Sequence, residues 1–263
     1  MRHGHDTHAS PHPPRPVTAY DGDERSVVDL LVDQVEFADV LVVNKADRVT
    51  AAQLGELQAL LRHLNPDARQ LVATRGVVPL AALLGTGRFD FARAEAAPGW
   101  QKELAGEHLP ETEEYGIGSF VYRARRPFHP ERLWACAAEG LPGVLRAKGF
   151  FWVATRPALM VSWSQAGEHL EVQPAGVWYA AQPEASWEAD EEIRAELEGL
   201  WHPELGDRRQ EIAIIGQRLD QAGLTARLDA ALLTTAEMAC GAASWQHFAD
   251  PFPAWTVEAV PDA

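Results

Sequence analysis

An unbroken apolar run, Val40-Leu41-Val42-Val43, leads directly into the polar tetrapeptide Asn44-Lys45-Ala46-Asp47. A short apolar run without polar alternation is typical of a strand buried on both faces, as in a parallel sheet. Apolar residues recur at helical spacing before this run, within 23–37, and leucines do so after it, within 54–64. A second short strand is expected at 70–73. This order of elements predicts part of an open α/β sheet with parallel strands.

The tetrapeptide after the first strand has residue types suited to recognising guanine. The Asp47 carboxylate can accept hydrogen bonds from the ring N–H and the exocyclic amine of guanine, a pair of donors that adenine lacks. Asn44 can bond the base edge or hold the neighbouring loop, and the Lys45 stem can lie along the face of the base. Asn-Lys-x-Asp after a buried strand resembles the base-recognition motif of P-loop GTP-binding proteins. The phosphate-binding motif G-x-x-x-x-G-K-[ST] does not occur in the 263 residues.

The charge balance and the cysteine positions limit which kinds of partner and ligand are expected. Asp and Glu outnumber Lys and Arg by 38 to 23, which gives a formal net charge of -15. A nucleic-acid-binding protein usually has a basic face, so nucleic acid is not expected as a partner. Cys136 and Cys240 match no metal-ligand spacing. No apolar run reaches the length of a membrane span and no secretory signal is evident, so we expect a cytoplasmic protein without a membrane partner.

Residues 1–22 form a segment rich in His and Pro with few apolar side chains. Such a segment buries too little surface to offset its chain entropy, so we expect a disordered tail. Its imidazoles can gather around Zn²⁺, although a solvated tail without a specific role explains the same composition. The candidate ligands follow the pattern H-x-H-x2-H-x3-H and are His3, His5, His8 and His12.

From residue 117 onward the pattern changes to short alternating strands and amphipathic helices. The expected strands cover 119–125, 144–154, 158–164, 170–179 and 211–215. The expected helices begin at Pro130, at 188 and at 219, the second of them acidic. This order matches the split βαβ, ferredoxin-like plan of an α+β domain with an added acidic helix. His129, next to the first helix, is expected to cap or pack and not to bind metal.

Taken in order, these segments resemble CobW-type proteins, a metal-handling branch of the P-loop GTPases. The similarity covers about 23–253 and is carried by 23–39 with 44–47, by 87–90, 98–100, 119–122 and 126–133, and by 209–212 with 228–233. The resemblance implies a partial G domain at 23–96, a linker at 97–116 and a ferredoxin-like CobW C-terminal domain at 117–253. Residues 1–22 and 254–263 would be tails.

The resemblance also implies a function in metal homeostasis or metal insertion. The metal would most often be zinc, the ligand GTP, and the partner a metal-dependent client protein. Ala73 and Thr74 would lie in the second guanine-facing loop, where backbone N–H groups meet the base carbonyl. Members of the family hydrolyse GTP.

The chain departs from the family pattern in one respect that affects this expectation. The phosphate loop, the Cys-rich metal motif and the Mg²⁺-binding acidic strand of the family do not occur in these residues. We therefore expect neither Mg²⁺ binding nor GTP hydrolysis by the chain alone, and we assign no catalytic residue. Whether the chain is itself an enzyme stays open.

We interpret the chain as a truncated CobW-type protein. The alternatives are a stand-alone C-terminal interaction module without nucleotide activity and one half of a split G protein. The shortened sheet is expected to expose a strand edge and apolar helix faces, through which the chain would self-associate.

Overall fold

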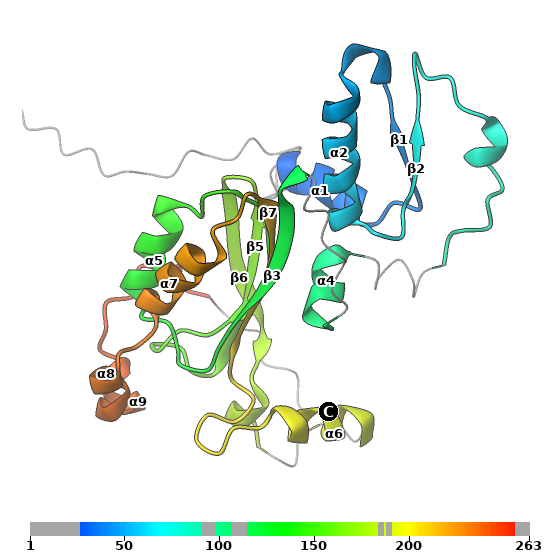
Figure 1. The fold of residues 1–263 in the computed structure, drawn as a ribbon. Coiled ribbons are helices and arrows are strands. Elements are labelled where there is room, and N and C mark those ends of the chain that lie inside the picture. Colours follow the sequence, from blue (N-terminus) through cyan, green and yellow to red (C-terminus); the bar gives the residue numbers. More distant parts are fainter. Residues whose placement is uncertain (1–26, 91–97, 107–114, 184–186, 188–190, 256–263) are drawn as a thin grey trace, which may run out of the picture.

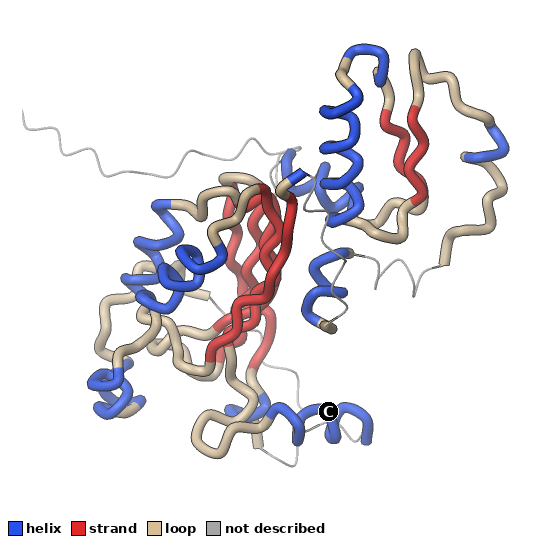
Figure 2. Tube along the Cα trace, viewed as in Figure 1, coloured by secondary structure: helices blue, strands red, loops and turns tan. Residues whose placement is uncertain are grey.

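The structure, a computed structural model, describes residues 27–90, 98–106, 115–183, 187 and 191–255. The described residues contain a two-stranded sheet of order β1-β2 and a five-stranded sheet of order β3-β7-β4-β5-β6. Figure 1 shows the two sheets as separate bodies with their own helices, and Figure 2 shows the same division by element type. The predicted tail 1–22, including His3, His5, His8 and His12, lies outside the described residues.

The N-terminal part is built from two parallel strands and the helices beside them. Its elements are α1 (Val27–Glu36), β1 (Val40–Val43), η1 (Ala46–Arg48), α2 (Ala51–Leu64), β2 (Arg69–Val72) and η2 (Leu80–Ala82). The strands pair in parallel, with Val40 opposite Arg69 and Val43 opposite Val72. The predicted parallel sheet is therefore confirmed.

Two polar residues define where the helix between the strands begins and ends. The Thr50 hydroxyl accepts a hydrogen bond from the backbone N–H of Gln53. In return, the Gln53 side chain accepts a hydrogen bond from the backbone N–H of Thr50. This capping box starts α2. Asn65 ends the helix, and its buried side-chain amide donates to the carbonyls of Val35, Glu36 and Ala38, each at 2.9 Å. Asn65 thereby ties the end of α1 to the end of α2.

The first strand is less buried than its apolar sequence predicted. In β1 only Val43 is buried, whereas Val42 is 41% exposed and Val72 of β2 is 48% exposed. Helix α2 lies on one side of the two strands (Figure 1). Among the described residues, β1 and β2 pair only with each other, so each has one strand edge without a described neighbour, and self-association through these edges stays a prediction.

The C-terminal part is an antiparallel sheet covered by two helices on one face. Its elements are β3 (Ile117–Ala124), α5 (Pro130–Glu139), β4 (Val144–Phe151), β5 (Leu159–Ala166), β6 (His169–Val177), η4 (Tyr179–Ala181), α6 (Glu191–Leu200), β7 (Gln210–Gln217), α7 (Gln221–Ala231), α8 (Thr235–Cys240) and α9 (Ala242–Trp245). All four strand pairings are antiparallel. The predicted α/β part followed by an α+β C-terminal domain is confirmed.

The connectivity refines the ferredoxin-like expectation. Strands β3 and β4 both lie beside β7, so β3, α5 and β4 form one split βαβ unit around β7. The acidic helix that was expected from residue 188 onward is α6, which lies beyond the end of the sheet (Figure 1). Helix α7, which follows β7, packs beside α5.

An aromatic cluster forms the core between the sheet and its helices. Phe151 is fully buried, and its ring centroid lies 6.0 Å from that of Phe128, 5.8 Å from Trp163 and 6.4 Å from Phe252. A second cluster gathers Trp152, Trp178, Leu233 and Trp245. The helices α8 and α9 were not predicted, and α9 supplies Trp245 to this second cluster.

Two segments near the predicted domain boundaries pack against other described parts of the chain. Trp255, placed in the tail 254–263, lies with its ring 4.5 Å from the Arg156 guanidinium and 5.8 Å from Phe252. The linker 97–116 contains a helix, α4 (Gly99–Leu104). A Cβ atom at Gly99 would lie 1.8 Å from the carbonyl oxygen of His63, so only glycine permits this approach of α4 to the end of α2. Such contacts depend on tertiary packing, which turn and charge patterns do not report.

Candidate functional site

Two loops meet at the carboxyl ends of β1 and β2, residues 44–47 and residues 73–76. Neighbouring parallel strands bring their carboxyl ends to the same sheet edge, which is where ligands bind in open α/β sheets. The Ala46 N–H donates to the Ala73 carbonyl at 3.1 Å, and the Ala73 N–H donates to the Val43 carbonyl at 2.9 Å. The structure thus brings together all five predicted guanine-site residues, Asn44, Lys45, Asp47, Ala73 and Thr74.

Asn44 holds the second loop in place. Its side-chain oxygen accepts a hydrogen bond from the backbone N–H of Gly76 at 2.9 Å. Of the two roles open to Asn44 from sequence, the structure shows the loop-holding one. Gly76 was missed as its partner, although the Arg75-Gly76 dipeptide directly after a short strand is a signal for a turn.

The second loop is a tight turn with two residues in the left-handed region. Arg75 has φ 53° and Gly76 has φ 73°, and the Val77 N–H donates to the Thr74 carbonyl at 3.1 Å. Positive φ at both central residues is the type I′ pattern, which favours glycine. The turn is therefore defined by its own backbone and by the Asn44 side chain.

The Lys45 backbone sets the direction of the first loop. Lys45 has φ 60° and ψ 32°, a left-handed conformation, and it precedes the short helix η1 that contains Asp47. Left-handed non-glycine residues are strained and are often found at ligand sites. The side chains of Lys45 and Asp47 are exposed, and no other described side chain pairs with them. Both remain available to a ligand.

The described residues contain no group of three or more His, Cys, Asp or Glu side chains placed to hold a metal ion. His129 packs its ring 4.6 Å from that of Phe248 and makes no side-chain cap, so the packing alternative holds. Burial lowers the pKa of His129, and the nearby Arg132 charge acts in the same direction. A neutral, packed imidazole has a structural role here.

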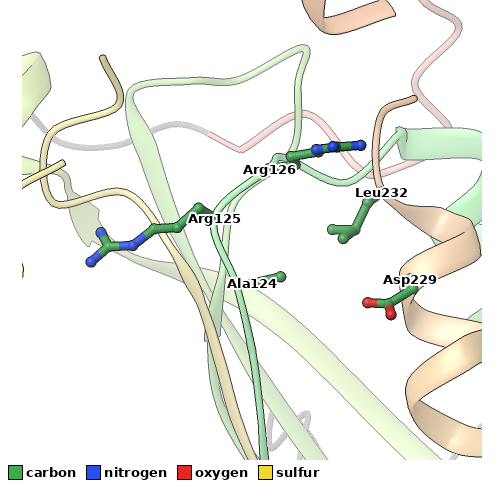
Figure 3. A pocket seen from close by; sticks show the side chains of 5 residues that line it. All are labelled: Ala124, Arg125, Arg126, Asp229 and Leu232. Carbon is green, nitrogen blue, oxygen red and sulfur yellow. The ribbon is translucent and has the colours of Figure 1, made fainter. Parts of the chain in front are cut away.

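A cleft of about 420 Å³ lies at the end of β3 and is lined by Ala124, Arg125, Arg126, Asp229 and Leu232 (Figure 3). The Arg125 side chain points away from Asp229 and donates to the Leu200 carbonyl at 2.7 Å. Asp229 accepts a hydrogen bond from the Tyr122 hydroxyl at 2.9 Å. These contacts hold the fold together, so the cleft is a weaker candidate than the two loops.

Comparison with known proteins gives the same order of domains. The model of the CobW/HypB/UreG nucleotide-binding domain matches residues 16–72, and that of the cobalamin synthesis protein cobW C-terminal domain matches residues 117–232. The chain belongs to the CobW family. In this CobW-family chain the first match includes β1 and the tetrapeptide 44–47, and the second covers the five-stranded sheet with α5 and α7.

Several curated relatives carry zinc in their names. The chain is 44% identical over 238 residues to zinc-regulated GTPase metalloprotein activator 1 of Dictyostelium discoideum, covering 89% of this chain and 50% of the relative. It is 35% identical over 236 residues to the zinc chaperone Rv0106 of Mycobacterium tuberculosis, covering 89% and 56% respectively. The chain thus spans about half the length of these curated relatives.

A solved structure, the Zn(II)-bound YjiA GTPase from E. coli, aligns with 77% of this chain and 54% of that one. The TM-score is 0.36 and the identity 16%, so no residue is transferred from it. In the part of the chain that the structure describes, no helix has the length and apolar character that crossing a membrane requires.

Proposed function

We propose that this CobW-family chain acts in zinc homeostasis and that its loops 44–47 and 73–76 recognise the guanine base of a nucleotide. The observation that carries the proposal is the hydrogen bond from Gly76 N–H to Asn44. It joins the two loops and leaves Asp47 exposed between the strand ends. The names of two relatives, a zinc-regulated GTPase and a zinc chaperone, support zinc as the metal. The partner we propose is a cytoplasmic, metal-dependent client protein.

The proposed contacts follow from the donors and acceptors in the two loops. Asp47 would accept from the ring N–H and the exocyclic amine of guanine, and the Lys45 stem would cover one face of the base. The Ala73 N–H is already donated to Val43, so Ala73 supports the loop rather than binding the base. Thr74 and Arg75 supply the backbone N–H groups for the guanine carbonyl.

Base recognition and phosphate chemistry are separate in this proposal. The 263 residues contain no G-x-x-x-x-G-K-[ST] motif, so they lack the lysine and the clustered N–H groups that hold phosphates. We infer that these residues recognise the base but neither hold Mg²⁺ nor hydrolyse GTP alone.

Asp47→Asn tests the proposed base contact. Asparagine keeps one acceptor and adds a donor, which suits the N–H and carbonyl of xanthine better than the two donors of guanine. We expect GDP binding to weaken on the order of 100-fold, because two charge-assisted hydrogen bonds are affected, and XDP binding to strengthen. Competition against a ribose-labelled fluorescent GDP measures both affinities.

Asp67→Asn is the matched control, since Asp67 pairs with Lys102 at 2.8 Å, away from the two loops. It should leave the preference for GDP over XDP and ADP unchanged. Equal binding of GDP and ADP by the wild-type chain would contradict guanine recognition. Absence of binding by either nucleotide would instead favour the stand-alone C-terminal module.

We also propose that the tail histidines His3, His5, His8 and His12 bind Zn²⁺. Imidazole is a good zinc ligand, and a segment of this composition can gather several of them. Isothermal titration with ZnCl₂ should show one fewer zinc equivalent after all four histidines are replaced by asparagine. His247→Asn, at an exposed histidine elsewhere, is the control. Unchanged stoichiometry in the fourfold variant would remove the tail as a site.

A further inference from the structure

A fully buried arginine of the C-terminal sheet binds two carboxylates of helix α1. Arg146 lies on β4, and its Nε and Nη2 atoms donate to the two carboxylate oxygens of Glu36 at 2.8 and 3.1 Å. Nη2 also donates to Asp33 at 3.1 Å. The side chains of Arg146 and Glu36 are both 0% exposed. The two-pronged contact constrains the orientation as well as the distance between β4 and α1.

A neighbouring cation completes this ionic cluster. Lys148 follows Arg146 by two residues on β4, so the two side chains share one face of the sheet. The Lys148 Nζ lies 3.8 Å from Asp33 and 5.3 Å from the ring centre of Trp100 in α4. The cluster therefore involves α1, α4 and β4, which belong to both parts of the chain.

The buried charges are better suited to specifying one arrangement than to adding stability. Desolvation of an ion pair offsets much of its attraction, and apolar residues of similar size often stabilise as well or better. An apolar contact would, however, tolerate sliding of α1 across the sheet. The fixed geometry of a guanidinium and a carboxylate does not tolerate it.

The cluster is connected to the loops that form the guanine site. Glu36 is the last residue of α1, and its carbonyl accepts from the Asn65 side chain at 2.9 Å. The Asn65 side-chain oxygen in turn accepts from the backbone N–H groups of Asp67 and Ala68, just before β2. Strand β1 starts four residues after Glu36. The ion pair is thus linked to the start of both strands, and each strand has only 4 residues before its loop.

We propose that Arg146 is a positioning residue for the guanine-recognition loops, which couples them to the C-terminal sheet through Glu36 and Asn65. A shift of β4 moves α1 and, with it, the starts of β1 and β2. Conversely, a ligand that orders loops 44–47 and 73–76 stabilises the contact with β4. The effect on nucleotide binding rests on the proposed function, whereas the structural link from Arg146 to the two loops does not.

Hydrogen exchange of the full chain without nucleotide tests the link directly. Arg146→Met should raise amide exchange in 40–48 and 69–77 by about tenfold more than it raises exchange of the β7 amides of 212–215. Arg227→Met is the matched control, because Arg227 of α7 pairs at 2.8 Å with Glu139 of α5, whose side chain is 72% exposed. Unchanged exchange in both loops of a folded Arg146→Met variant would overturn the proposal.

If Arg146→Met loses the protection of β7, Glu36→Gln replaces it, because glutamine keeps the shape of the side chain and removes its charge. The same increase in loop exchange is expected. A folded Glu36→Gln variant with wild-type exchange in both loops would count against the link as well.

A second measurement adds GDP. In the wild-type chain, GDP should slow exchange in β4, and in Arg146→Met it should slow exchange in the loops alone. Slowing confined to the loops in both proteins would overturn the coupling. If GDP does not bind, the proposed guanine recognition fails, and the nucleotide-free experiment still decides the link.

Discussion

Phe151→Ala is expected to lower the free energy of unfolding of the C-terminal domain by roughly 3–5 kcal/mol. Phe151 is fully buried and contacts the rings of Phe128, Trp163 and Phe252. Its removal leaves a cavity where the sheet meets the segment that carries Phe252. Surrounding aromatic rings cannot collapse into such a cavity without leaving their preferred contacts. Urea unfolding followed by tryptophan fluorescence measures the change.

Phe89→Ala provides the comparison for this first prediction. Phe89 is 71% exposed, so its truncation should change the free energy of unfolding by no more than about 0.5 kcal/mol. Similar values for the two variants would contradict the assignment of Phe151 to the centre of the core.

Removing one partner of the buried ion pair should destabilise the chain much more than removing both. Arg146→Met or Glu36→Leu alone leaves a buried charge without its main partner, and each should cost about 3–5 kcal/mol. The double variant replaces both charges by apolar side chains and should cost far less than the sum. The remaining Asp33 and Lys148 side chains are 32% and 25% exposed, so water reaches them. A double-mutant cycle on urea unfolding measures the coupling energy.

The surface pair of Arg227 and Glu139 sets the scale for this cycle. With the Glu139 side chain 72% exposed, its coupling energy should stay below about 1 kcal/mol. If the Arg146 and Glu36 effects simply add, the two charges are not energetically coupled, and the geometric argument for a positioning role loses its basis.

Local patterns predicted most of the elements. The capping box at Thr50, the stop at Asn65 and the glycine after α5 act through residues three or four positions away, so they can be recognised in the sequence. The fold class followed from the order of such segments. Helices α8 and α9 were not predicted, because both are short and have little periodicity.

Burial and contacts between the two parts could not be predicted in the same way. The apolar run of β1 indicated a strand buried on both faces, yet Val42 is 41% exposed. Sequence pattern reports what a strand can bury, whereas actual burial depends on which elements cover it. The helix α4 within the predicted linker is a further case, since its position depends on the close approach of Gly99 to His63.

The tetrapeptide 44–47 and its surroundings separate what the sequence determines from what the tertiary structure determines. The sequence by itself determined the strand and the Asn-Lys-Ala-Asp tetrapeptide that follows it, because these depend on neighbouring residues. It also determined the family, because the order of short segments along the chain is visible in the sequence. Only the tertiary structure decided that Asn44 holds the turn at Gly76, 32 residues away, and that Arg146 meets Glu36 across 110 residues. Such contacts form when two surfaces pack together, and the residues between them in the chain carry no local signal of that packing.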